Sequence, residues 1–425
     1  MRCYPLIPGY NDLNVYIDDV STHLKEANEL VDDALVTYEY TMDFFAEIGQ
    51  SRNNYKSFRT AINLFFNWCW FQKRISVTKV TRKEMRQFVD WCNEPPHDLI
   101  SSNNCATYVT DNGDYKINPK WRPFLNTSGK PYSRTITTVK NQLSLISSWY
   151  VFLADMNFCV SNPAAILMRR LTSNNTKVSL NDTDREKSLN DNQFANVMKV
   201  AHMLAAKDPE KHERTLFLAY ILFFLYPRIS EISCRVGYSP TFSDFQRVTV
   251  NSSSEYWCFN IPSSKGGKSR KVSCNSYVIK ALKRYRRHLG LSDLPSTDEN
   301  IPLFIRHKPG THGRQMGEID ANLGVDQLAG IITGLFKVTA VFMKDKHPLD
   351  AAELKTFTAH SARHYGISLQ VRSNRPLADI AMDSGHGDLK MLQHYISKRI
   401  ENRIILAFNQ KLPFANKDLI IELAA

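Results

Sequence analysis

Near its C-terminal end the chain reads Ala359-His360-Ser361-Ala362-Arg363, followed by Gly385-His386 and then by Tyr395. An arginine, two histidines and a tyrosine at these intervals are the side chains that phosphoryl transfer to a tyrosine hydroxyl needs. Upstream, Pro227-Arg228-Ile229-Ser230-Glu231 and Ser264-Lys265-Gly266-Gly267-Lys268 supply a second arginine and a lysine. The sequence therefore contains, in order, the groups of a phosphate-transfer site.

The order of these groups resembles the tyrosine recombinases, the family of phage integrases and bacterial chromosome-dimer recombinases. Six positions carry the resemblance: Arg228, Lys265, His360, Arg363, His386 and Tyr395. The spacings from Arg363 to His386 and from His386 to Tyr395 also match, and the resemblance covers roughly residues 40 to 410. It implies a site-specific DNA recombinase or integrase that cuts and rejoins strands through a 3′-phosphotyrosine, without a metal or ATP.

The resemblance also implies a role for each matched side chain. Tyr395 would attack the scissile phosphate, and Glu231 would orient Arg228 or His360. The phosphorane would be held by Arg228, His360, Arg363 and His386, with His360 accepting the proton of the tyrosine. These assignments give the expected catalytic set.

The residue types support the same chemistry independently. A phosphodiester under attack gathers charge on its non-bridging oxygens, which two fixed guanidiniums can clamp. Arg228 follows the apolar run Leu222 to Tyr226, so its side chain leaves a buried helix end toward an anion. The alternative is a structural ion pair with Glu231, three residues further on.

Two histidines on one helical face raise a second alternative. His364 lies four residues after His360, as in a zinc site, but the sequence offers no third ligand at a convincing interval. His386 and Tyr395 are nine residues apart, about 900° of helical rotation, so the chain must turn between them. We expect Tyr395 to lie on its own short helix, from Leu389 to Ile396.

The glycine pair after Lys265 predicts a β-hairpin, with strands at Tyr256 to Ile261 and Arg270 to Cys274. A lysine at a hairpin tip can protonate the leaving 5′ oxygen, or it can simply contact phosphate. From Pro262 to His288 there are nine lysines or arginines and no acid, which predicts a surface that follows the DNA backbone. The expected DNA-binding residues are Lys268, Arg270, Lys271, Lys283, Arg284, Arg286 and Arg287.

Composition limits the class of protein. The 425 residues include 54 basic and 42 acidic side chains, giving a net charge of +12 that favours a polyanionic partner. Eight cysteines are scattered and never form Cys-x-x-Cys, which is typical of reduced thiols in a cytosolic protein. We expect no signal segment and no membrane span, and therefore a cytoplasmic, nucleoid-associated location.

Helical periodicity predicts a mainly α-helical chain, and its length of 425 residues suggests two or three domains. Amphipathic helices are expected at Tyr55 to Phe71, Thr81 to Trp91 and Thr135 to Ala154; Trp149, Tyr150 and Phe152 are expected in the core rather than as base-stacking groups. The four-helix pattern resembles the core-binding domain that precedes the catalytic domain in tyrosine recombinases. With that resemblance, the expected divisions are an N-terminal extension (1–31), a helical core-binding domain (32–171) with a loop insertion (93–131), a polar linker (172–186), a mixed α/β catalytic domain with a small antiparallel sheet (187–410), and a C-terminal tail (411–425).

The expected partners are duplex DNA recombination sites and further copies of this chain. The resemblance implies that the apolar tail is handed to a neighbouring protomer in a cyclic tetramer on two sites; the alternative is that it packs on its own domain. Two rival functions remain open. One is strand relaxation like that of a type IB topoisomerase, and the other is a catalytically silent DNA-binding protein on the same fold.

Overall fold

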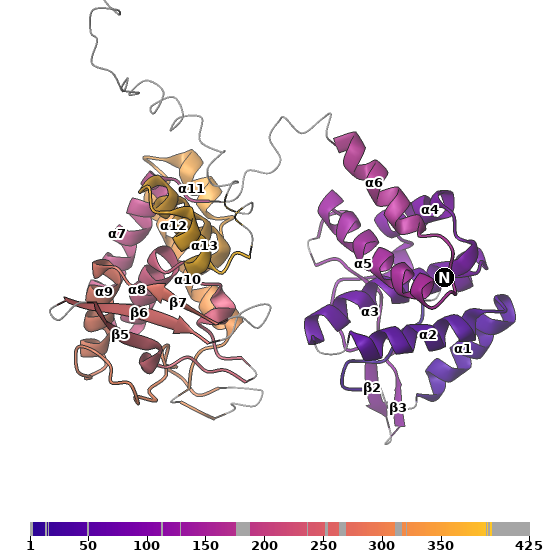
Figure 1. The fold of residues 1–425 in the computed structure, drawn as a ribbon, viewed down its shortest axis with the longest axis horizontal. Helices are drawn as coiled ribbons and strands as arrows, with labels where there is room; N and C mark the ends of the chain where they lie inside the picture. The colour runs from indigo at the N-terminus through magenta and orange to yellow at the C-terminus, as the bar shows by residue number, and fades with distance from the viewer. Residues whose placement is uncertain are drawn as a thin grey trace, which may run out of the picture. The chain divides into compact units, whose positions relative to one another are not determined.

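A computed structural model describes residues 3–12, 15, 17–48, 51–111, 114–127, 129–175, 188–235, 237–250, 254–262, 269–310, 317–319, 321–387, 389 and 392. The chain divides into two compact units, Met1–Thr183 and Asp184–Ala425, and Figure 1 shows both.

The first unit is a helical bundle with two small strand pairs (Figure 1). Its helices are α1 (Asp18–Leu30), α2 (Ala34–Glu47), α3 (Arg52–Phe66), α4 (Arg82–Asn93), α5 (Ile136–Asp155) and α6 (Pro163–Asn175). Its strands are β1 (Ile100–Ser101), β2 (Tyr108–Asp111), β3 (Asp114–Ile117) and β4 (Phe124–Leu125). A π-helical segment, Asn67–Lys73, continues α3.

Local sequence signals explain where these helices begin. Thr81 and Glu84 form the expected capping box at the start of α4, and the Thr135 hydroxyl accepts from the amide of Thr138 at the start of α5. The aromatic residues of α5 are core residues, as predicted: Trp149 is 0% exposed, and its indole N–H donates to the Thr41 hydroxyl.

The N-terminal residues are part of this core, which corrects the expectation of a separate extension. Leu6 and Ile7 are both 0% exposed. The amide oxygen of Asn63 accepts from the backbone N–H of Leu6 at 2.7 Å, and Asn67 accepts from that of Tyr4 at the same distance. These buried asparagines satisfy the backbone of an irregular segment that a helix-period analysis cannot detect.

The expected loop insertion also has structure of its own. β2 pairs with β3 in antiparallel register, and β1 pairs with β4 in parallel. Tyr108 is buried, and its hydroxyl donates to the carbonyl of Pro5 at 2.5 Å. The segment therefore packs against the N-terminal residues instead of projecting as a loop. At the other end of the unit, α6 continues to Asn175, into the stretch expected to be linker.

The second unit is mostly helical and contains a three-stranded antiparallel sheet in the order β5-β6-β7. Its helices are α7 (Asp191–Lys207), α8 (Pro209–Phe224), α9 (Ser276–His288), α10 (Val325–Met343), α11 (Pro348–Leu354), α12 (Ala359–Arg372) and α13 (Leu377–Ser384). The strands are β5 (Phe245–Val250), β6 (Ser254–Ile261) and β7 (Arg270–Ser273). In Figure 1 the sheet lies below α12 and α13 in this unit.

The expected hairpin is confirmed, because β6 pairs with β7 from Ile261 opposite Arg270 to Cys258 opposite Ser273. The predicted fold class, mainly α with a small antiparallel sheet, is confirmed as well. α13 packs against β7, which brings the end of α13 close to the first residue of that strand.

Helix α10 is long and apolar enough, by length and composition alone, to cross a membrane. Its Leu328, Ile332, Leu335 and Phe336 side chains are nevertheless buried in the core of the second unit. The core helix of a globular domain can be equally long and apolar, so packing in the core explains the apolar composition of α10.

Candidate active site

A strained turn directs Arg228 away from the end of α8. Tyr226 has a φ of +41°, which is unusual for a tyrosine, and Pro227 follows it. Arg228 then begins a single 3-10 turn, Ile229–Glu231. The carboxylate of Glu231 accepts from the Arg228 backbone N–H at 2.7 Å and from its Nη1 at 2.9 Å. The ion pair considered from the sequence is therefore present, yet the Arg228 side chain stays 29% exposed.

Arg270, the first residue of β7, binds the same carboxylate from another direction. Its Nη1 lies 2.9 Å from Oε1 of Glu231 and its Nη2 lies 2.6 Å from Oε2. Glu231 is 2% exposed and Arg270 is 9% exposed. Burial alone would raise the pKa of Glu231, but the Arg270 and Arg228 guanidiniums hold it below its ordinary value. The carboxylate is therefore ionised between two arginines.

Three successive backbone carbonyls at the end of α13 accept hydrogen bonds from three different arginines. Asp383 accepts from Nε of Arg270 at 2.8 Å, Ser384 from Nη2 of Arg363 at 2.6 Å, and Gly385 from Nη2 of Arg228 at 3.3 Å. These carbonyls are among those that a helix leaves unpaired at its C-terminus, where cations are favoured. The guanidinium groups of the three arginines therefore lie close together at the C-terminal end of α13.

Arg363 connects the C-terminal end of α13 to the strained turn at Tyr226. It is 2% exposed, and its Nη1 donates to the carbonyl of Tyr226 at 2.5 Å. Gly366, three residues along α12, has no room for a side chain, because a Cβ there would lie 2.3 Å from the carbonyl oxygen of Phe223. α12 and the end of α8 are therefore in direct backbone contact.

A second buried network, formed by Tyr226, Arg375 and Asp383, stabilises the turn before Arg228. Arg375 pairs with the carboxylate of Asp383 at 2.7 Å and donates to the Tyr226 hydroxyl at 3.0 Å. The Tyr226 hydroxyl lies 3.3 Å from the same carboxylate. Burial raises the pKa of Asp383, while Arg375 lowers it. The side chains of Tyr226, Asp383 and Arg375 thus hold α13 and the turn before Arg228 in one arrangement.

His386 follows directly on this cluster. Its Nδ1 lies 2.9 Å from the Ser384 hydroxyl, and its backbone N–H donates to the carbonyl of Ala381. Burial, together with the nearby Arg363, Arg228 and Arg270, lowers the pKa of His386 to about 4. The imidazole is therefore neutral at pH 7 and lies beside a cluster of arginines.

His360 lies one turn before Arg363 on α12 and is exposed. Its ring and that of His364 are in edge-to-face contact, with centroids 4.2 Å apart. Across the described ranges, no group of three His, Cys, Asp or Glu side chains has the geometry to hold a metal ion. The expected residues Lys265, Lys268 and Tyr395 lie outside the described residues.

The basic stretch before His288 differs from the expected DNA surface. Arg286 is 1% exposed and paired with Glu299, so its guanidinium is not available to DNA. Arg284 is paired with Glu213 of α8, and Arg287 pairs with Asp293 at 2.6 Å. The acids that neutralise these arginines come from outside the basic stretch, so a local count of charges missed them. Lys271 is exposed and Lys283 is half-buried.

Sequence reasoning missed the role of Arg270, although the strand contains a signal for it. Side chains alternate along a strand, so Arg270 shares a face with Val272, which is buried, whereas Lys271 points the other way. An arginine on the buried face of a strand needs a buried acid, and Glu231 is that acid. Asp383, Arg375 and Tyr226 were also missed, because no local pattern marks them.

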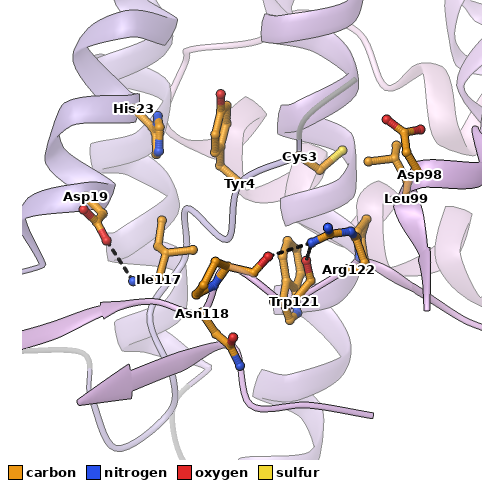
Figure 2. A pocket seen from close by; sticks show the side chains of 12 residues that line it. Cys3, Tyr4, Asp19, His23, Asp98, Leu99, Ile117, Asn118, Trp121 and Arg122 are labelled. Atoms are coloured by element: carbon orange, nitrogen blue, oxygen red, sulfur yellow. Dashed lines mark hydrogen bonds between the residues drawn. The ribbon is translucent and has the colours of Figure 1, made fainter. Parts of the chain in front are cut away.

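A cavity of about 560 Å³ in the first unit is unrelated to these residues (Figure 2). Figure 2 shows Asp19 directed at the backbone of Ile117, whose N–H it accepts at 2.8 Å. Arg122 donates to the carbonyls of Pro119 and Trp121 at the wall of the cavity. Asp19 and Arg122 thus bond to nearby backbone, and none of the expected site residues lines the cavity.

Comparison with solved structures identifies the fold. The Tn1549 transposon integrase (residues 82–397) in complex with a circular intermediate DNA aligns with 88% of this chain and 98% of its own, with 12% identity and a TM-score of 0.51. A second complex of that integrase with circular intermediate DNA gives a TM-score of 0.50, also at 12% identity, over 88% of this chain and 99% of its own. The chain has the tyrosine-recombinase fold.

A lambda integrase dimer bound to a COC′ core site aligns over 88% of this chain and 78% of its own, with 10% identity and a TM-score of 0.46. No protein-family model and no curated protein sequence matches this chain. The likeness to the Tn1549 integrase confirms the fold expected from the six ordered residues. Within the tyrosine-recombinase fold, Arg228, Arg363 and His386 lie together at the end of α13.

Proposed function

We propose that this chain is a site-specific DNA recombinase of the tyrosine-recombinase family, which cuts and rejoins strands through a 3′-phosphotyrosine. The observation that carries the proposal is the convergence of three side chains on Ser384 and Gly385. Arg363 and Arg228 donate to their carbonyls, and His386 lies beside the Ser384 hydroxyl. Such a cluster of fixed donors matches the charge that develops on a phosphate oxygen under attack. Arg228 is its most exposed arginine, at 29%, and is the first that a phosphate would meet.

In the proposed reaction the Tyr395 hydroxyl attacks the phosphorus, and its proton passes to His360. The bond from phosphorus to the 5′ oxygen breaks, and Lys265 protonates that oxygen to give a free 5′-hydroxyl. The ester bond to the tyrosine replaces the broken phosphodiester, so rejoining to another strand needs no ATP. His386, neutral at pH 7, can hydrogen-bond a phosphate oxygen without adding a charge.

Duplex DNA is the proposed partner, and the first unit offers a basic hollow to its backbone. A cavity of about 460 Å³ between α4 and α6 is lined by Arg82, Lys83, Arg86 and Arg170, with no acid in the lining. Exposed basic side chains without a buried partner are suited to phosphate contacts. Lys271 of the second unit is exposed and suited to the same role.

A selection experiment tests this function without knowledge of the DNA site. Duplexes retained by the protein are selected from random sequence, and two copies of the enriched site are placed on one plasmid. We expect deletion or inversion of the segment between the copies. Relaxation of plasmids that lack the site would favour a topoisomerase instead. Enrichment of a site with no strand exchange and no covalent adduct would favour a silent DNA-binding protein.

We further propose that the enzyme acts as a cyclic tetramer on two sites, assembled through the tail after Gln410. The tail contains Phe414, Leu419, Ile420, Ile421 and Leu423, and it lies outside the described residues. Such an apolar terminus favours exchange between protomers. Truncation after Gln410 should leave single-site binding intact and abolish the paired-site complex on a native gel. A truncated protein that still forms the paired complex would contradict the tetramer proposal.

A further inference from the structure

We infer that Arg270 is a positioning residue for the proposed strand cleavage. It holds Glu231 in place, so that the Arg228 side chain stays directed at the scissile phosphate and the three side chains keep a net positive charge. The inference rests on the proposed function and adds to it a residue that the matched set does not contain. From the sequence, Arg270 was expected to contact DNA. Its position in the structure gives it a different role.

The hydrogen bonds of Arg270 are directed inward. Two of its nitrogens bind the two oxygens of Glu231, at 2.9 and 2.6 Å, and Nε binds the carbonyl of Asp383 at 2.8 Å. Its side chain is 9% exposed. A bidentate guanidinium on a buried carboxylate fixes both partners in one geometry, which a lysine cannot reproduce.

The charge balance at the site explains why a second arginine is needed. Glu231 would otherwise neutralise Arg228, and a phosphate would then approach a neutral ion pair. With Arg270 bound to the same carboxylate, the three side chains together carry one net positive charge. A buried carboxylate with only one partner would also be costly, because breaking one side of a buried pair leaves charge uncompensated.

Arg270 also joins parts of the site that are distant in sequence. It is the first residue of β7, whereas Glu231 lies in the turn after α8 and Asp383 lies near the end of α13. The guanidinium lies against Gly385, where a Cβ would be 2.9 Å from Nη1. Loss of Arg270 would therefore release the strand, the Arg228 turn and the segment that leads to His386 at the same time.

The test compares Arg270→Met and Arg270→Lys with Lys271→Met, a matched control on the opposite face of the same strand. Three quantities are measured for each full-length variant: duplex affinity as a function of salt, thermal midpoint, and rate of covalent adduct formation at saturating DNA on a nicked substrate. For Arg270→Met we expect a rate loss of about 100-fold from displacement of Arg228. Duplex affinity and its salt slope should change far less than the rate, because the nitrogens of Arg270 bind Glu231 and Asp383.

Arg270→Lys keeps the positive charge but cannot make the bidentate contact with Glu231. Its rate should therefore lie between those of the wild type and Arg270→Met. Lys271→Met should instead weaken duplex binding and reduce the salt slope by about one unit or less. If an Arg270 variant shows the reduced salt slope and a normal saturating rate, Arg270 is a phosphate contact and the inference is wrong.

A double-mutant cycle with Glu231→Gln separates positioning from a general structural effect. Because Arg270 acts through Glu231, Arg270→Met should lower the rate much less in the Glu231→Gln background than in the wild type. The same rate loss in both backgrounds would overturn the inference. If Arg270→Met does not fold, Arg270→Lys is carried through the same cycle. A wild-type protein that forms no adduct at all would overturn the proposed function, whereas normal adduct formation by both Arg270 variants would overturn this inference alone.

Discussion

Arg363 donates a hydrogen bond from Nη2 to the backbone carbonyl of Ser384 at 2.6 Å, and the Ser384 hydroxyl lies 2.9 Å from Nδ1 of His386. The arginine of α12 and the histidine after α13 are therefore joined through a single serine. A displacement of Arg363 would move Ser384 and with it His386, so substitutions at Arg363 and His386 are expected to affect the proposed cleavage in a coupled way.

Gly385→Ala should damage both stability and cleavage. Gly385 has a φ of +68°, and a Cβ there would lie 2.9 Å from the Arg270 guanidinium. We expect a loss of about 1 to 3 kcal/mol in the free energy of unfolding, measured by urea denaturation. The control is Gly387→Ala, where a Cβ would meet nothing within 4 Å. Equal stability of the two variants would show that the close approach of Arg270 to Gly385 is wrong.

Arg228→Ala and Arg363→Ala should each lower the rate of strand cleavage by at least about 100-fold. Arg228 is the exposed cation of the cluster, so its loss removes a donor to the developing charge. Arg363 is buried, and its loss releases the carbonyls of Tyr226 and Ser384 and removes a nearby positive charge. The rate is measured as adduct formation at saturating DNA. Arg287→Ala serves as the control, since its side chain is 64% exposed and paired with Asp293. If Arg228→Ala cleaves DNA as fast as Arg287→Ala, then Arg228 does not contact the scissile phosphate and the proposed site is wrong.

His386 should titrate with a midpoint near pH 4, because burial and the neighbouring arginines lower its pKa to about 4. The ordinary value is about 6.5, so as the pH falls the unfolded chain takes up this proton before the folded one does. His386 should therefore stabilise the fold fully above about pH 6.5, and this contribution should fade as the pH drops toward 4. Nuclear magnetic resonance titration of the imidazole checks the midpoint, and His386→Asn should flatten the dependence of unfolding on pH. A midpoint near 6.5 would contradict the buried arrangement.

Arg286→Met should destabilise the second unit without affecting DNA binding. Arg286 is 1% exposed and its partner Glu299 is 13% exposed, so the substitution leaves a largely buried carboxylate without its main partner. We expect a loss of about 3 kcal/mol in the free energy of unfolding, measured by urea denaturation. Arg287→Met, one residue further along α9, should change stability little, because exposed pairs contribute little. Weaker duplex binding by Arg286→Met under conditions where it remains folded would restore the sequence-based assignment.

Several helices and the small sheet follow from local patterns in the sequence, whereas the candidate site was expected from the resemblance to tyrosine recombinases. Helical periodicity predicted α3, α4 and α5, and the glycine pair after Lys265 predicted the β6–β7 hairpin. The resemblance implied a common site for Arg228, Arg363 and His386, and these residues lie together although they come from different elements.

The sequence indicated the pair of Arg228 with Glu231, but it did not reveal which acids neutralise the other arginines, because those pairs are formed by tertiary contacts. Arg286 and Glu299 are in different segments, and Arg270 and Glu231 are far apart in the chain. A charge count along the chain treats these arginines as surface residues, whereas burial makes them structural. The N-terminal segment was misjudged for a similar reason, because Asn63 and Asn67 satisfy its backbone from α3 and its π-helical continuation.

The central claim is that Tyr395 forms a covalent bond to DNA in a site built around Arg228, Arg363 and His386. The most direct measurement incubates wild type and Tyr395→Phe with a nicked duplex of the selected site in EDTA, and maps any DNA-linked peptide by mass spectrometry. We predict an adduct on Tyr395 in the wild type and none in Tyr395→Phe, with duplex affinities equal within about threefold because no charge is lost. An adduct on another residue, an adduct retained in Tyr395→Phe, or a reaction that requires added metal would contradict the account.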